Sequence, residues 1–198
     1  MDSQIRQKTA DAPRQKTVGT QRQKTHWSRL ILLVLLPCSL FLTPSCKENK
    51  WIDWKTQNEI WLEANKQKDS VQVSPTGLQY KITADPLKNN GEARPNETST
   101  IVCDYEVRLI NGVVIEARRG ASISLANTIP GFSEGCHKIH SSGDIELYIP
   151  AYLGYDAEKY QSDKYNEAEG YGTEGTTGYI PPYSTLIYKV HLCGITGN

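Results

Sequence analysis

The sequence has no uncharged apolar run long enough to cross a lipid bilayer as a helix. The longest such run, residues 30–42, has thirteen residues, whereas a transmembrane helix needs about 20. This length, behind a basic segment, is typical of the hydrophobic region of a signal peptide. We therefore expect residues 1–45 to be a signal peptide with an extended basic amino-terminal region.

The rest of the chain also lacks an excess of positive charge. The sequence has 22 Lys and Arg against 22 Asp and Glu, but residues 1–29 hold seven of the basic and two of the acidic residues. Because residues 30–46 are uncharged, residues 47–198 have 15 basic and 20 acidic residues, a net charge of −5. Nucleic acid is not expected as a partner, since binding to phosphates requires a basic surface.

A cysteine follows the apolar run. The segment Leu42-Thr43-Pro44-Ser45-Cys46 resembles the lipobox of bacterial lipoproteins, in which cleavage before the cysteine exposes it for lipid attachment. Ser45 fits this pattern, whereas Thr43 stands where leucine is usual. The resemblance implies lipidation at Cys46 and a lipid-anchored location in the bacterial cell envelope, facing the periplasm or the outer surface. An ordinary secretory signal and an uncleaved anchor are the alternatives.

Cysteine is too scarce in the rest of the chain for a disulfide framework. Three cysteines follow Cys46, and an odd number leaves at least one unpaired. Cys103 alternates with apolar residues in a strand pattern and Cys136 is expected to face inward from a short helix, so both are interpreted as small core residues. A Cys103–Cys193 disulfide stays open. Cys136 and the two histidines near it lack a fourth ligand, so neither a metal nor another cofactor is expected.

Residues 46–77 are expected to contain the lipidated cysteine, a linker and one helix. The spacings of three, seven and four residues place Trp51, Trp54, Trp61, Leu62 and Asn65 on one helical face. The sequence leaves three roles open for this face: docking on the folded domain, packing against a second copy as a homodimer, and contact with the membrane interface. The strand pattern that follows is complete without the helix, which is therefore expected to be dispensable for the fold.

Alternating apolar and polar residues mark the remaining chain as a series of short strands. Asn111-Gly112 between two such runs is a strong hairpin signal, and Pro130 opens a brief helix that ends near Gly143. This order predicts an α+β domain over residues 78–193, with an antiparallel sheet covered by the helix on one face. The expected strands are 78–83, 100–109, 113–116, 121–125, 145–149 and 185–192, and the expected helix is 129–139.

Five motifs resemble the FKBP family of peptidyl-prolyl isomerases, in its bacterial, Bacteroidetes-like envelope lipoprotein branch. They are Gly77-Leu-Gln-Tyr, Val102-Cys-Asp-Tyr105 with Asn111-Gly112, Ile129-Pro-Gly-Phe-Ser-Glu-Gly135, Glu146-Leu-Tyr-Ile-Pro150 with Leu153-Gly-Tyr155, and Ile180-Pro-Pro-Tyr-Ser-Thr-Leu-Ile-Tyr-Lys-Val190. Their order over residues 77–192 makes the resemblance specific. It implies an FKBP-like antiparallel sheet wrapped around one short helix, and proline-containing polypeptides as substrates.

The same resemblance assigns the site residues. It implies four catalytic residues that form the walls and floor of an apolar pocket: Tyr105, Phe132, Tyr155 and Tyr188. It implies four substrate-binding residues around them: Ile115, Glu116, Ile129 and Ile180. The Tyr155 hydroxyl and the Ile129 backbone N–H are expected to hold substrate carbonyls. The family has Phe-Asp where this chain has Ile115-Glu116, and an apolar residue where it has Thr128, so the rim of the site departs from the family.

A polar insertion, residues 156–178, separates the last two motifs and is longer than the loop that the family has there. In the family, this loop overhangs the site and shapes the choice of substrate. Loops of this length in compact domains are usually functional or disordered, and its tyrosines favour contact with a partner. Two functions follow from these features. The first is a prolyl isomerase that assists the folding of envelope proteins, with activity weakened by the altered rim. The alternative is a catalytically weak or inactive FKBP-fold lipoprotein that binds a protein partner through the insertion.

Overall fold

The computed structural model describes residues 49–157, 165–166 and 168–197. The predicted signal peptide, residues 1–45, and the predicted lipidation site Cys46 lie outside these described residues, as does part of the insertion. Among the described residues, no helix combines the length and the apolar character needed to cross a membrane.

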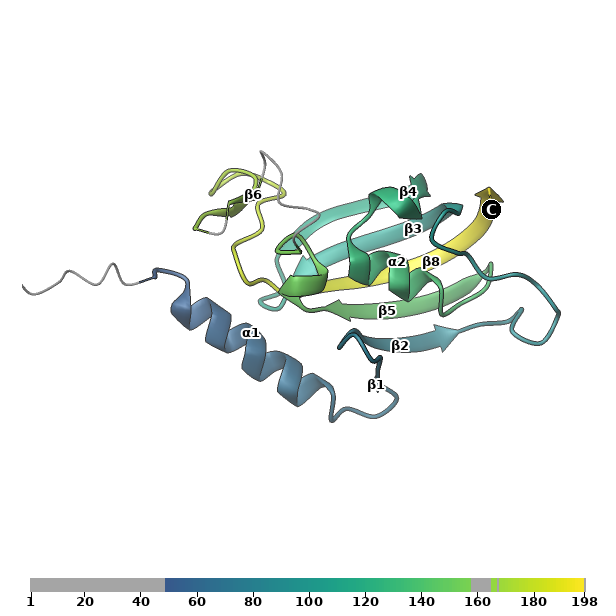
Figure 1. Cartoon of the computed structure of the whole chain (residues 1–198), viewed down its shortest axis with the longest axis horizontal. Coiled ribbons are helices and arrows are strands. Elements are labelled where there is room, and N and C mark those ends of the chain that lie inside the picture. Colours follow the sequence, from purple (N-terminus) through teal and green to yellow (C-terminus); the bar gives the residue numbers. More distant parts are fainter. Residues whose placement is uncertain (1–48, 158–164, 167, 198) are drawn as a thin grey trace, which may run out of the picture. The chain divides into compact units, whose positions relative to one another are not determined.

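A six-stranded antiparallel sheet is the main element of the described chain (Figure 1). Its strand order is β1-β2-β5-β8-β3-β4. The strands are β1 (Gln72–Val73), β2 (Gln79–Ala84), β3 (Thr100–Leu109), β4 (Val114–Ser124), β5 (Gly143–Ile149) and β8 (Leu186–Gly197). A separate two-stranded sheet, β6 (Tyr165–Asn166) and β7 (Gly170–Tyr171), lies within the insertion. With its helices, this sheet confirms the predicted α+β class.

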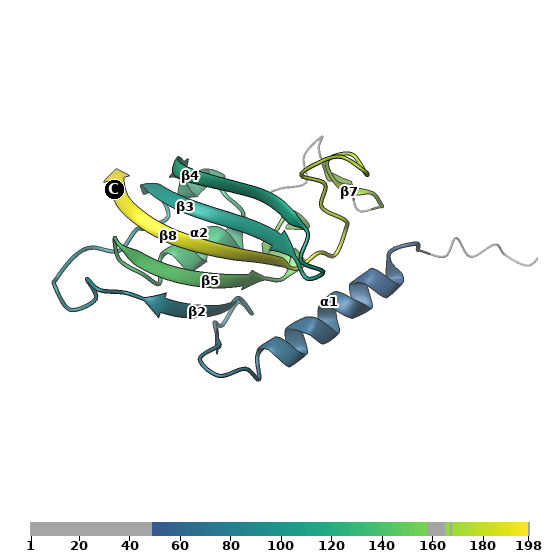
Figure 2. The same ribbon diagram turned by 180° about the vertical axis from the view of Figure 1, so that it is seen from behind.

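The short helix α2 (Pro130–Cys136) covers one face of the sheet, and the opposite face is open (Figure 2). Two glycines allow it to lie unusually close to β5. A Cβ atom on Gly131 would lie 2.4 Å from Cγ2 of Ile149, and one on Gly135 would lie 2.4 Å from Cδ2 of Leu147. The close approach buries Phe132 of α2, which is 3% exposed, against the sheet.

The strands differ from the predicted ones in two places. The expected strands 113–116 and 121–125 are a single strand, β4, which pairs with β3 through two register shifts. Gly120 lies in this strand with φ at +59°, so a bulge rather than a loop joins the two halves. Strand β8 continues to Gly197 because it pairs with β3 as far as Thr100.

The Cys103–Cys193 disulfide that the sequence left open does not form. Cys103 is fully buried and pairs across the sheet with Leu192. Side chains alternate between the faces of a strand, so Cys193, one residue further along β8, points to the other face and is exposed. Cys103, Cys136 and Cys193 are all free thiols, and the first two are core residues as predicted.

Helix α1 (Ile52–Asn65) docks at the end of the sheet where β5 ends and β8 begins (Figure 1). The Trp54 indole N–H donates to Oγ of Ser184 at 3.0 Å. The ring centroids of Trp61 and of Tyr148 on β5 lie 5.8 Å apart. Docking is thus the role that the structure gives to the tryptophan face. Association into a homodimer through α1 stays a prediction.

Two buried asparagines of α1 also form hydrogen bonds with the rest of the domain. Asn58 is 2% exposed and its Oδ1 accepts the backbone N–H of Thr185 at 2.7 Å. Asn65 is 1% exposed and its Nδ2 donates to Oε1 of Gln79 at 3.0 Å. Because a buried N–H without an acceptor is costly, these contacts make α1 part of the folded unit. They argue against the expectation that the helix is dispensable.

Asn58→Ala is expected to lower the free energy of unfolding by about 1–3 kcal/mol, because it leaves the buried Thr185 N–H without its acceptor. Chemical denaturation of the two proteins measures this difference. Gln57→Ala, an exposed position on the same helix, is the matched control and should change stability by less than about 0.5 kcal/mol. Equal effects of the two substitutions would show that the Asn58–Thr185 contact does not contribute to stability.

Candidate active site

Three aromatic rings from three elements meet between the sheet and α2. Tyr105 comes from β3, Phe132 from α2 and Tyr188 from β8. The ring centroids lie 5.1 Å apart for Phe132 and Tyr188, 6.0 Å for Tyr105 and Tyr188, and 6.2 Å for Tyr105 and Phe132. These spacings are typical of favourable aromatic pairs. Three of the four predicted catalytic residues therefore form one cluster.

Glu116 is tied to this cluster by its side chain. The Tyr105 hydroxyl donates to Oε2 of Glu116 at 2.7 Å. Arg118 Nε donates to the other carboxylate oxygen, Oε1, also at 2.7 Å. The two donors fix the carboxylate beside the tyrosine despite the extra methylene of glutamate relative to aspartate. This departure from the family's residue thus retains a hydrogen bond between the carboxylate and the tyrosine.

The phenols of the cluster are held in their neutral form. Burial raises the pKa of Tyr188 well above its ordinary value, and the nearby Tyr155, Tyr105 and Glu116 raise it further. Burial, followed by the hydrogen bond to Glu116, also raises the pKa of Tyr105. Both hydroxyls therefore remain protonated at neutral pH. The cluster supplies hydrogen-bond donors and apolar surface rather than a general base.

Tyr155 lies at the mouth of the site, just after the 3-10 helix η2 (Ala151–Leu153). Its ring stacks on Tyr171 of the insertion, with centroids 4.2 Å apart and an interplanar angle of 26°. Both rings line a cavity of about 590 Å³. The other lining residues are Val107, Val114, Ile115, Glu116, Ala117, Thr177, Gly178, Ile180 and Tyr188.

The cavity thus brings together five of the eight residues expected at the site: Ile115, Glu116, Tyr155, Ile180 and Tyr188. Phe132 and Tyr105 are not among the lining residues but contact Tyr188 through their rings. Ile129 precedes α2 and is 4% exposed. In the part of the chain that the structure describes, its backbone N–H donates no hydrogen bond to another backbone group. This is the group that was expected to hold a substrate carbonyl.

Sequence reasoning placed one component of the site only through the family resemblance and did not identify its residues. Tyr171, Thr177 and Gly178 belong to the insertion, which was expected to contact a partner or to be disordered. The isolated β-bridge between Tyr171 and Ile180 joins the insertion to the final motif. Gly170 with φ at +92° is the local signal, because a glycine beside a tyrosine in a polar loop allows such a close backbone approach.

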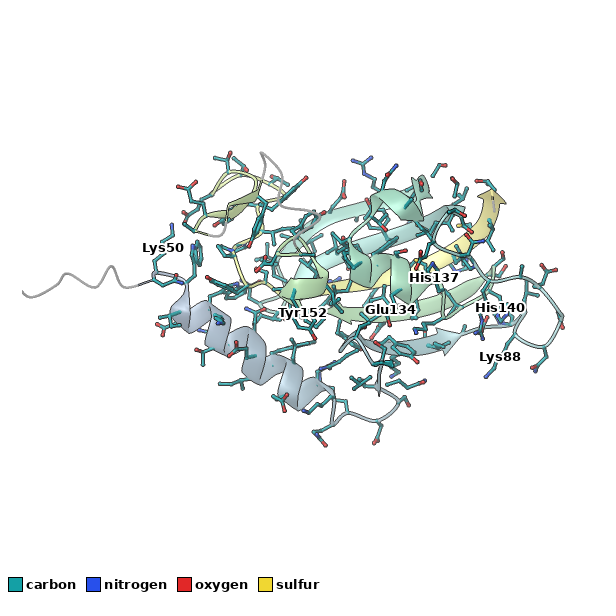
Figure 3. All side chains as sticks on the ribbon, in the orientation of Figure 1. Lys50, Lys88, Glu134, His137, His140 and Tyr152 are labelled. Atoms are coloured by element: carbon teal, nitrogen blue, oxygen red, sulfur yellow. The ribbon has the colours of Figure 1, made fainter. Side chains whose placement is uncertain are left out.

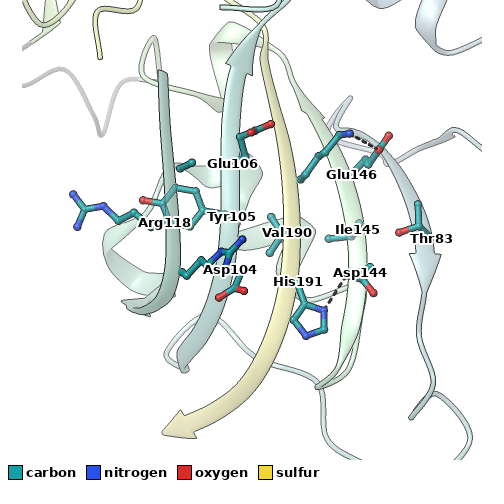
Figure 4. A pocket seen from close by; sticks show the side chains of 13 residues that line it. Thr83, Asp104, Tyr105, Glu106, Arg118, Asp144, Ile145, Glu146, Val190 and His191 are labelled. Carbon is teal, nitrogen blue, oxygen red and sulfur yellow. Dashed lines mark hydrogen bonds and ion pairs between the residues drawn. The ribbon is translucent and has the colours of Figure 1, made fainter. Parts of the chain in front are cut away.

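The open face of the sheet carries a second hollow of about 580 Å³ (Figure 4). Charged side chains line it, and several are paired across strands. His191 Nδ1 lies 2.9 Å from Oδ1 of Asp144, and Lys189 Nζ lies 3.8 Å from Oε1 of Glu146. Such pairs between neighbouring strands are typical of a solvated sheet face. Tyr105 of the aromatic cluster also lines this hollow, but most of its other lining residues are charged.

The match to known families agrees with this geometry. Residues 91–193 match the family described as FKBP-type peptidyl-prolyl cis-trans isomerase. The chain belongs to this family. The matched segment contains every catalytic and substrate-binding residue expected from the sequence, from Tyr105 to Tyr188.

Individual relatives of the FKBP-type family support the assignment. The outer membrane protein MIP of Legionella longbeachae is 30% identical over 145 residues, which are 71% of this chain and 54% of that protein. The FKBP-type peptidyl-prolyl cis-trans isomerase FkpA of Escherichia coli K12 is 31% identical over 147 residues, 72% of this chain and 47% of FkpA. The chain thus spans about half the length of these curated relatives.

A solved structure has the same fold. The crystal structure of FkpA from Escherichia coli superposes with a TM-score of 0.59 at 28% identity, covering 73% of this chain and 60% of that chain. That protein is named as an FKBP-type peptidyl-prolyl cis-trans isomerase.

Proposed function

We propose that this FKBP-type domain catalyses the cis–trans isomerisation of X–Pro bonds in polypeptides. The observation that carries the proposal is the cluster of Phe132, Tyr105 and Tyr188 behind a cavity that Tyr155 and Glu116 line. It provides an apolar floor, aromatic walls and hydrogen-bond donors within one site. Membership of the family adds support, because the motif residues supply this arrangement.

An apolar cavity suits this reaction because rotation about an amide bond needs no acid or base. The barrier of about 18–20 kcal/mol comes from amide resonance. The planar amide carries charge separation that water stabilises, whereas the twisted amide carries less. Transfer of the bond from water to a cavity lined by Ile115, Ile180 and Tyr188 therefore favours the twisted state. A reduction of about 5 kcal/mol would raise the rate several thousandfold.

Two donors would orient the substrate in this scheme. The Tyr155 hydroxyl and the Ile129 backbone N–H would each take one carbonyl of the peptide. Glu116 would act indirectly, since its hydrogen bond fixes the Tyr105 ring. Ile115 gives the rim a smaller, non-aromatic surface than the phenylalanine usual in the family. We therefore propose an activity weaker than that of members with the usual rim.

Tyr155→Phe is expected to lower kcat/KM on a short X–Pro peptide by about two- to tenfold. The change deletes one hydroxyl and keeps the ring, and the loss of one hydrogen bond corresponds to about 0.5–1.5 kcal/mol. A coupled isomerisation assay measures it. Tyr152→Phe is the control, because Tyr152 lies three residues before Tyr155, in η2, but does not line the cavity.

Two outcomes of that assay would contradict the proposal. The first is a wild-type rate equal to the uncatalysed rate that the double substitution Ile115→Phe and Glu116→Asp fails to raise. The second is an equal effect of Tyr155→Phe and Tyr152→Phe, which would place the hydroxyl outside the reaction. The first outcome would favour the alternative of a protein-binding module, with residues 156–178 as its contact, whereas the second would remove only the Tyr155 hydroxyl from the proposed mechanism.

We propose further that the domain works in the bacterial cell envelope, anchored by lipid at Cys46 and assisting the folding of envelope proteins. The short apolar run, the Ser45-Cys46 pair and a relative named as an outer membrane protein support this. Mass spectrometry of the mature amino terminus is expected to find Cys46 carrying a diacylglyceryl group, with residues 1–45 removed. An intact 1–45 segment on the purified protein would exclude lipidation at Cys46.

A further inference from the structure

The start of α1 contacts the insertion as well as the sheet. The Trp51 indole N–H donates to the backbone carbonyl of Ala168 at 2.9 Å. The ring centroids of Trp51 and Tyr179 lie 6.3 Å apart. Lys50, labelled in Figure 3, pairs with Glu174 at 2.8 Å. That ion pair is exposed and contributes little, so Trp51 provides the main contact.

The contacted part of the insertion is in turn fixed to the cavity. The Tyr171 N–H donates to the Ile180 carbonyl at 2.8 Å, and the Ile180 N–H donates to the Tyr171 carbonyl at 3.0 Å. A Cβ atom on Gly170 would lie 2.1 Å from the Ile180 carbonyl oxygen, so this approach requires glycine. The Tyr179 hydroxyl donates to the Glu169 carbonyl at 2.5 Å and joins the two sides of the segment.

Tyr171 is where this chain of contacts reaches the site. Its ring lies against Tyr155, and both rings line the cavity of about 590 Å³. A substrate held by the Tyr155 hydroxyl would therefore lie next to the Tyr171 ring. Removal of the ring would leave that side of the cavity more open to water. Tyr171 thus has the position of a wall.

We propose that Tyr171 is a substrate-contacting wall of the cavity, and that Trp51 is a positioning residue that holds this wall in place from α1. The inference rests on the proposed isomerase function, because it assigns the cavity to a proline-containing peptide. It adds a component from residues 168–180 that the five family motifs do not supply, apart from Ile180. It also gives Trp51, the N-cap residue of α1, an effect on the affinity for substrate.

The test compares Trp51→Ala and Tyr171→Ala with the wild type and with Trp61→Ala. Trp61 is on the same helix but packs on Tyr148, away from the insertion, so it is the matched control. Steady-state isomerisation of an X–Pro tetrapeptide is expected to show KM raised about three- to tenfold in both variants, the effect of one lost aromatic contact, with kcat nearly unchanged. Trp61→Ala should leave KM unchanged.

Two further variants separate positioning from direct contact. The double variant Trp51→Ala with Tyr171→Ala should raise KM no more than Tyr171→Ala alone, because the two residues act through the same wall. Trp51→Phe keeps a ring beside Tyr179 and loses the bond to Ala168, so it should give an intermediate KM. Thermal unfolding of each variant identifies those that do not fold.

Hydrogen exchange provides a readout that does not depend on activity. The Tyr171 and Ile180 amides are expected to exchange faster in Trp51→Ala than in Trp61→Ala, because the β-bridge opens more often. Unchanged exchange, or faster exchange with an unchanged KM, would overturn the inference while leaving the isomerase function intact. An inactive wild type would instead refute the proposed function. Titration of the same peptide into wild type and Tyr171→Ala would then decide the inference, with equal affinities overturning it.

Discussion

Phe132→Ala is expected to lower the free energy of unfolding by about 3–5 kcal/mol, the usual cost of removing a buried phenylalanine, and to lower kcat/KM at least tenfold. Phe132 is 3% exposed and contacts both Tyr105 and Tyr188. Its removal would leave a void behind the cavity and let water approach the bound amide. Chemical denaturation and the coupled isomerisation assay measure the two effects.

A second core truncation separates the loss of activity from the loss of stability. Ile101→Ala removes a fully buried side chain on β3 that does not line the cavity. It should cost about 2–5 kcal/mol of stability while the folded fraction retains its kcat/KM. Phe132→Leu, which keeps an apolar side chain at the floor, should retain more activity than Phe132→Ala. Comparable activity losses in Ile101→Ala and Phe132→Ala would show that Phe132 has no specific role in the reaction.

Gly135→Ala is expected to destabilise the domain by about 1–3 kcal/mol, the range for overpacking a core. The added methyl would lie 2.4 Å from Cδ2 and 2.5 Å from Cδ1 of Leu147, which is fully buried. The added methyl and the Leu147 side chain would overlap in the packed core, so α2 must move away from β5. Because Phe132 is on this helix, the same movement should also raise KM for the peptide. Thermal or chemical unfolding and the isomerisation assay measure these changes.

Two comparisons make this prediction specific. Gly194→Ala in β8 is the control, since a Cβ atom there meets nothing within 4 Å and stability should change by less than about 0.5 kcal/mol. Leu147→Ala with Gly135→Ala should cost less than the sum of the single changes, because the alanine makes room for the added methyl. Strict additivity would show that the two side chains do not meet.

The sheet was predictable where one of its faces is buried. Alternation marks β3, β5 and β8 because their inward residues, such as Cys103, Leu147 and Leu192, are apolar and fully buried. Strand β4 was divided in two because Arg118, Arg119 and Gly120 interrupt the pattern. These residues are exposed at an edge of the sheet, where hydrogen bonding to β3 rather than burial maintains the strand. Periodicity does not detect such a segment.

Helix α1 was found from its tryptophan face, but the hydrogen bonds of its buried asparagines were not predicted. Asn58 and Asn65 are seven residues apart and face the domain. Asn65 falls on the predicted tryptophan face, but asparagine is usually exposed, so apolar periodicity passes over Asn58 and indicates no contact for either residue. Their roles depend on the positions of the Thr185 N–H and the Gln79 side chain, which lie far along the chain. The family motifs located most of the candidate site, whereas the part played by Tyr171 depends on a backbone contact with Ile180.

The two edges of the sheet have a consequence for a protein that we propose handles unfolded chains. Unfolded clients carry unpaired strands that can add to any exposed sheet edge. Here one edge strand, β1, has only two residues, and the other, β4, has two register shifts and exposed Arg118 and Arg119. Neither edge offers a long, regular template. We therefore expect both edges to limit strand addition by the unfolded polypeptides that we propose the cavity binds.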